Sequence, residues 1–70
     1  MDPKEEREID EIMYETNGKI SAIVEEIRQI RFSSMDEGKK QEKMDSLREE
    51  FERVMLEEEK KVEAVMKKYS

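Results

Sequence analysis

The chain has 70 residues, of which 49% are charged, and its formal net charge is -6 at pH 7. A chain of this length forms one domain, residues 1–70, and buries little surface, so it usually needs a disulfide, a structural metal or self-association. Cys and His are both absent, which excludes disulfides and the common zinc sites and leaves self-association. The acidic balance makes nucleic acid an unlikely partner, because nucleic-acid-binding proteins neutralise phosphates with Lys and Arg.

Apolar residues nowhere form a run long enough for a transmembrane helix or a signal peptide. We therefore expect a soluble protein with no membrane partner. The absence of Cys fits a reducing compartment, and we expect a cytoplasmic location.

The first predicted helix covers about residues 3–33. Asp2 is placed to cap it, Pro3 suits its first position, and Glu5 follows at the spacing of a capping box. Apolar or small residues then recur every three or four positions, which is the spacing of a heptad pattern. These residues are Ile9, Met13, Thr16, Ile20, Ile23, Ile27 and Ile30.

The dipeptide Asn17-Gly18 contradicts this helix locally. Asn-Gly favours a turn, and Gly costs ~1 kcal/mol relative to Ala inside a helix. The apolar spacing nevertheless keeps its phase across the dipeptide. We expect one helix with a weak or bent point, and the alternative is a break into two shorter helices.

A polar segment at about residues 34–40 predicts the turn. Ser34 and Glu37 fit a capping box that starts the second helix, while Gly38 is an alternative end for the first helix. The second predicted helix covers about residues 41–69 and repeats the apolar spacing. Its members are Met44, Leu47, Phe51, Met55, Glu58, Val62, Val65 and Tyr69.

The two patterns predict an all-α, antiparallel two-helix hairpin of the coiled-coil type. Folding at the polar segment pairs Ile30 with Met44 near the turn and Ile9 with Val65 near the chain ends. A shift by one heptad would instead place Glu37 against Ile30. The first register is therefore favoured, because it buries apolar side chains against one another.

The apolar stripe of each helix spans about 120°, which is wider than two facing helices can cover. We therefore expect a homodimer that forms a four-helix bundle, with the relative direction of its two hairpins left open. The edge left for the second copy, or for a helix of another protein, consists of Ile12, Val24, Val54 and Met66. The alternative is ordinary partial exposure on a monomer.

Thr16 and Glu58 face each other in this register. They are a candidate polar layer that fixes the register of the helices. The alternative is that Glu58 extends its carboxylate past the small Thr16 into solvent, since an unpaired buried carboxylate is costly.

Two further groups of exposed residues are candidate binding surfaces. A possible outer docking surface consists of Tyr14, Phe32 and Leu56, although singly exposed apolar residues are also ordinary. A possible basic patch near the turn consists of Arg28, Arg31, Lys39, Lys40 and Lys43.

The sequence offers no basis for catalysis. It lacks His and Cys for general-base or thiolate chemistry, and it has no glycine-rich loop for phosphates. The acidic runs lack the spacing of a calcium-binding loop. We expect no enzyme activity, no catalytic residues, no cofactor and no metal.

The layout resembles small helical hairpins of several unrelated groups, including Rop-like RNA-binding dimers, secretion co-chaperones and secretion needle subunits. The likeness is architectural, because the Pro-containing turn of needle subunits is missing, as is the Trp-x-Gly turn of another secreted hairpin family. The sequence therefore predicts a non-enzymatic protein-protein interaction module: a small regulator, adaptor or chaperone that self-associates. The alternatives are a Rop-like nucleic-acid-binding regulator that uses the basic end, or a structural segment of a larger assembly.

Overall fold

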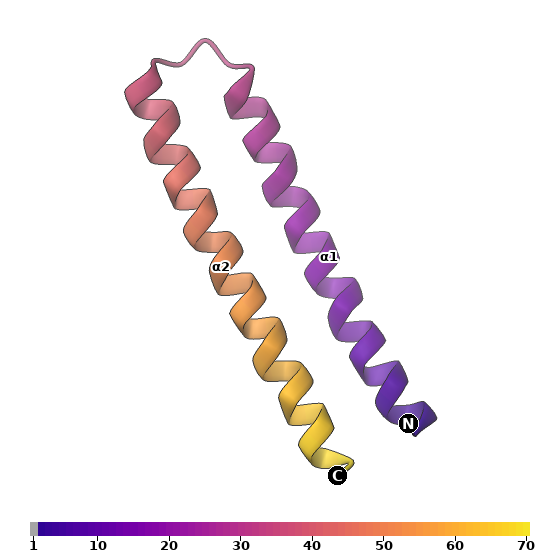
Figure 1. The fold of residues 1–70 in the computed structure, drawn as a ribbon. Helices are drawn as coiled ribbons and strands as arrows, with labels where there is room; N and C mark the ends of the chain where they lie inside the picture. Colours follow the sequence, from indigo (N-terminus) through magenta and orange to yellow (C-terminus); the bar gives the residue numbers. More distant parts are fainter. Residues whose placement is uncertain (1) are drawn as a thin grey trace.

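The computed structural model describes residues 2–70 and consists of two helices, α1 (Pro3–Arg31) and α2 (Glu37–Lys68). The helices lie side by side and run in opposite directions, with both chain termini at the end away from the turn (Figure 1). Residues 2–70 contain no strand. The predicted all-helical hairpin is therefore confirmed.

Helix α1 starts where its sequence signals place it and continues through Asn17-Gly18 without a break. The Asp2 carboxylate accepts a hydrogen bond of 2.8 Å from the Lys4 backbone N–H, and Pro3 is the first helical residue. Gly18 does not adopt a positive φ, and a Cβ built on it would meet nothing within 4 Å. A residue with a side chain would therefore also fit at position 18. The helix continues through Asn17-Gly18 because packing against α2 outweighs the local turn preference.

The turn is shorter than predicted and comprises residues 32–36. Helix α1 ends at Arg31, where the Ser33 hydroxyl donates to the carbonyl of Ile30 at 2.8 Å. Helix α2 starts earlier than expected because its N-cap is Asp36, whose carboxylate accepts from the Lys39 N–H at 3.0 Å. Gly38 therefore lies in the first turn of α2 and does not terminate α1.

Two ion pairs define the register of the hairpin. The Lys68 ammonium lies 2.9 Å from the Glu8 carboxylate near the chain ends, and the Lys19 ammonium lies 4.0 Å from the Glu57 carboxylate near mid-length. Both pairs agree with the predicted register to within one helical turn. A shift by one heptad would separate their partners by about 10 Å.

The hairpin has very little interior. Among residues 2–70, only Thr16, Ile23 and Leu47 are buried, and no large side chain is completely enclosed. The Cα trace extends 51 × 15 × 10 Å with a radius of gyration of 16.2 Å, compared with about 11 Å for a compact domain of this length. The accessible surface is 5779 Å², whereas a compact monomer of this mass exposes about 4,600 Å². A single copy is thus a rod with excess surface.

Candidate interaction surface

One long face of the hairpin is polar, and two ion pairs link the helices along it. Lys19 of α1 and Glu57 of α2 form one such pair. Glu26 and Glu50 lie one heptad nearer the turn on the same stripes of α1 and α2, and both line a shallow hollow between the helices. The other polar residues of this hollow are Gln29, Ser33, Lys43 and Ser46. We call this side of the hairpin the polar face.

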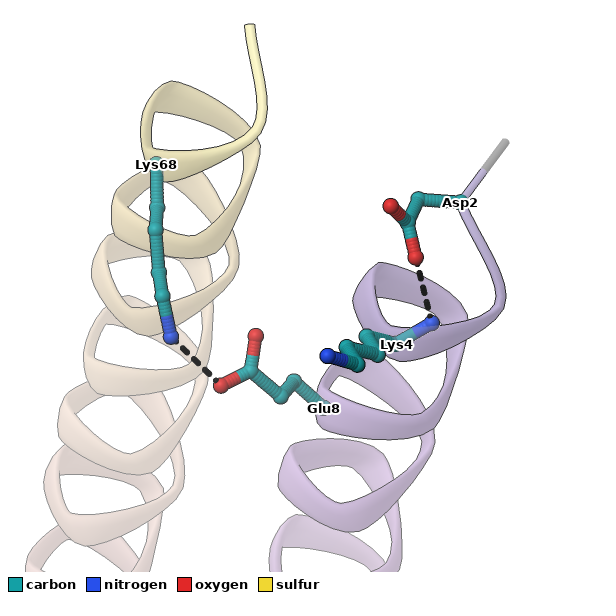
Figure 2. A network of polar contacts seen from close by, with 4 residues as sticks. All are labelled: Asp2, Lys4, Glu8 and Lys68. Carbon is teal, nitrogen blue, oxygen red and sulfur yellow. Dashed lines mark hydrogen bonds and ion pairs between the residues drawn. The ribbon is translucent and has the colours of Figure 1, made fainter.

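The ion pair of Glu8 and Lys68 lies on the polar face beside the chain ends. Figure 2 shows the Glu8 side chain reaching from α1 toward Lys68 of α2. The hydrogen bond from Lys68 is the main cause that lowers the pKa of Glu8, and the nearby Tyr69 hydroxyl is the second. The other carboxylate oxygen of Glu8, Oε2, is buried and has no partner with ordinary hydrogen-bond geometry among residues 2–70. Glu8 also raises the pKa of both Lys68 and Tyr69.

The opposite face exposes apolar side chains from both helices. Arg31 of α1 and Met44 of α2 line one hollow beside the turn, so the stripes through these two residues border the same face. Val24 lies one heptad before Arg31, and Phe51 lies one heptad after Met44. We call this side the apolar face. Its exposed members are Met13 at 46%, Val24 at 47%, Phe51 at 39%, Met55 at 39% and Met66 at 51%.

A shallow groove continues the apolar face along α2. Phe51, Met55, Leu56 and Val62 form its apolar lining. Glutamates border the groove, namely Glu52, Glu58, Glu59 and Glu63. This arrangement of an apolar centre with a charged border is typical of a protein interaction site.

The four residues predicted as the association edge divide between two environments. Val24 and Met66 lie on the apolar face, where they are about half exposed. Ile12 lies one heptad before Lys19, toward the polar face, and Val54 lies one heptad after the buried Leu47, on the row between the helices. Both are half-buried.

Met13, Phe51 and Met55, which the apolar spacing placed between the helices, are instead exposed on the apolar face. The most buried positions of α1 are Thr16 and Ile23. Ile12 and Met13 project to opposite sides of that row, and α2 covers the side that carries Ile12. The sequence signal for this choice was the pair of opposite charges, Lys19 and Glu57, that the predicted register brings close together. Such a pair indicates which side of each apolar stripe faces the other helix.

Thr16 and Glu58 lie level with each other, since Lys19 is one turn after Thr16 and pairs with Glu57, the neighbour of Glu58. Thr16 is buried, with 6% of its surface exposed, and Glu58 is half-buried. Glu58 also lines the groove along α2. The structure therefore brings these two residues to one level and leaves Glu58 open to the groove.

The predicted outer docking residues do not form one surface. Tyr14 and Phe32 are strongly exposed on α1 and its C-cap, at 82% and 81%. They are separated by about 27 Å along the helix axis. Leu56, at 51%, belongs instead to the apolar lining of the groove on α2.

The predicted basic residues surround the turn without converging. Arg28 pairs with Glu25 at 3.6 Å, and the Lys40 ammonium donates to the carbonyl of Arg31 at 3.4 Å. Arg31 and Lys40 line the hollow on the apolar side, whereas Lys43 lines the hollow on the polar face. Lys39 is exposed, and its backbone N–H donates a hydrogen bond to the carboxylate of Asp36, the N-cap of α2.

Neither α1 nor α2 is long and apolar enough to cross a membrane. Residues 2–70 hold no group of three or more acidic, His or Cys side chains that is arranged to bind a metal ion. No family model, curated protein or solved structure matches this chain. Function is therefore inferred from the geometry of the two faces.

Proposed function

We propose that this protein is a non-enzymatic protein-protein interaction module that acts as a self-associating hairpin. Two copies pack their apolar faces together and form a four-helix bundle. The observation that carries the proposal is the set of exposed apolar side chains gathered on one face, namely Met13, Val24, Phe51, Met55 and Met66.

The surface area of the hairpin supports a second copy as the occupant. A single chain exposes 5779 Å², which is about 1,200 Å² more than a compact monomer of its mass. A specific interface of standard size covers about 800 Å² of each partner. Covering the apolar face with a second hairpin of the same size would therefore bury most of the excess accessible surface.

The polar face supports the choice of side. Two ion pairs, Glu8–Lys68 and Lys19–Glu57, already link the helices on this face, and its other charges, such as Glu26 and Glu50, are exposed to solvent. A second copy gains little by covering charges that are paired and solvated. The apolar face, by contrast, gains about 25 cal/mol for each Å² of apolar surface removed from water.

The substitution Val24→Glu tests this proposal. It places a carboxylate at the centre of the expected interface, where burying a charge costs several kcal/mol. We expect the dimer dissociation constant to rise at least about a hundredfold, which corresponds to roughly 2.7 kcal/mol. Sedimentation measures the mass, and circular dichroism measures the helix content.

Ala22→Glu is the matched control, because it adds the same charge two positions away, at an exposed site on the stripe of Lys19 and Glu26. We expect this variant to dimerise like the wild type. The proposal is wrong if the two variants dimerise equally well. It is also wrong if Val24→Glu unfolds the chain even at concentrations where the wild type is a folded monomer, since Val24 would then stabilise the single hairpin.

A further inference from the structure

The charged residues of the apolar face are separated by sign along the length of the hairpin. Toward the turn, Arg31 and Arg48 are exposed beside Met44. Arg31 lines a hollow together with Met44, and Arg48 lies one helical turn after Met44 on α2. The hollow also contains Lys40 and one acidic residue, Glu37, so the turn end of this face has a net basic charge.

Acidic charge lies at the other end of the same face. Glu59 lines the groove of α2 between Met55 and Val62, and Asp10 is exposed one turn before Met13 on α1. The apolar face thus carries basic residues near the turn and acidic residues toward the chain ends.

These four charged residues, Asp10, Arg31, Arg48 and Glu59, form no ion pair within residues 2–70. They differ in this respect from Lys19, which is paired with Glu57 across the polar face. Charges that border an interface and lack internal partners set the orientation of the partner more than they set its affinity.

We infer that the second copy docks on the apolar face in the end-over-end direction, so that the two turns lie at opposite ends of the bundle. This inference rests on the proposed self-association and adds the direction in which the second copy packs. It requires a twofold axis perpendicular to the helices and level with the middle of α2, which gives a self-complementary interface.

This direction brings opposite charges together. The midpoint of α2 lies between Glu52 and Arg53, so reversal about this point places Arg48 of one copy within one turn of Glu59 of the other. The same operation places Phe51 of one copy against Met55 of the other. The apolar and the charged positions of α2 are therefore both self-complementary.

The alternative direction, with both turns at one end, brings like charges together. In that arrangement α1 of one copy packs over α2 of the other at the same height. Arg31 then lies within about one turn of Arg48, and Asp10 lies near the glutamates that border the groove. Juxtaposed like charges disfavour such an interface.

A distance measurement between two spin labels distinguishes the two directions. The chain has no Cys, so Ser34→Cys in the turn supplies one labelling site on each copy. In the end-over-end dimer, we expect the labels to be separated by about the 51 Å length of the rod. In the alternative dimer, two hairpins packed about 10 Å apart would bring the labels within about 20 Å.

The measurement is made on a sample whose mass has been determined by sedimentation. A dimer with the long distance supports the inference. A dimer with the short distance overturns it and leaves the proposed self-association intact, whereas a monomer at all concentrations overturns both.

Exchange of charges provides an independent test. Arg48→Glu turns two attractive contacts of the symmetric dimer into repulsive ones, and we expect it to weaken dimerisation by about tenfold. Adding Glu59→Arg to the same chain restores opposite charges and is expected to recover most of this loss. Arg53→Glu is the control, because Arg53 is exposed and lies off the apolar face. A double variant that dimerises as weakly as Arg48→Glu alone would contradict the end-over-end direction.

Discussion

At the scale of single residues, Glu8 lies at the centre of a small group with Lys68 and Tyr69 in which each residue shifts the pKa of its neighbours. Its pKa is lowered chiefly by the hydrogen bond from Lys68, so the ion pair stabilises the folded state above the ordinary glutamate value of 4.5. This contribution is lost as the pH falls through the lowered pKa. The pKa values of Lys68 and Tyr69 are raised by Glu8, so their contribution is complete below about pH 10 and is lost as the pH rises through the raised values.

We therefore expect Glu8→Gln to lower the melting temperature modestly at pH 7 and to have a much smaller effect at a pH below the lowered pKa of Glu8, where the wild-type side chain is also neutral. Thermal unfolding at a fixed protein concentration measures both values. Glu11→Gln is the control. Glu11 lies one helical turn after Glu8 on α1, is exposed and forms no ion pair within residues 2–70. An equal difference between Glu8→Gln and the wild type at both pH values would contradict the role of the ion pair.

At the scale of the elements, the N-cap of α2 determines where the turn ends. Asp36 accepts the hydrogen bond from the Lys39 N–H, whereas Ser34, the N-cap predicted from the sequence, lies within the turn and is exposed. We expect Asp36→Ala to reduce the free energy of unfolding by about 1 kcal/mol. Ser34→Ala is expected to change it by less than about 0.5 kcal/mol. Chemical denaturation measures both, and a larger effect of Ser34→Ala would show that the cap is misassigned.

The sequence was sufficient for the helices and their antiparallel register, because strong apolar spacing and the caps of α1 agree with one another. It was insufficient at the turn, since both Ser34 and Asp36 have capping side chains and short-range rules do not choose between them. It was also insufficient for the exact face of each helix. Ile12 and Met13 lie at similar angles on either side of the Thr16 row, and the choice depends on cross-helix pairs such as Lys19–Glu57.

At the scale of the whole molecule, the hairpin is a rod with one face whose polar groups suit water and one face that exposes apolar side chains. The polar face carries its own ion pairs, and the apolar face leaves side chains such as Val24 and Met66 about half exposed. No sequence pattern in one chain specifies what covers such a face. The excess surface and the separated charges are properties of the assembled hairpin, and they favour a second copy in the end-over-end direction.

The central claim is that two copies of this chain cover each other's apolar faces. The most direct test is the mass of the wild-type protein in solution, measured by sedimentation over a concentration series with helix content followed in parallel. We expect a species of twice 8.4 kDa that dissociates on dilution into single hairpins. A fully helical protein with the mass of one chain at every concentration would contradict the claim and would leave the apolar face free for a helix of another protein.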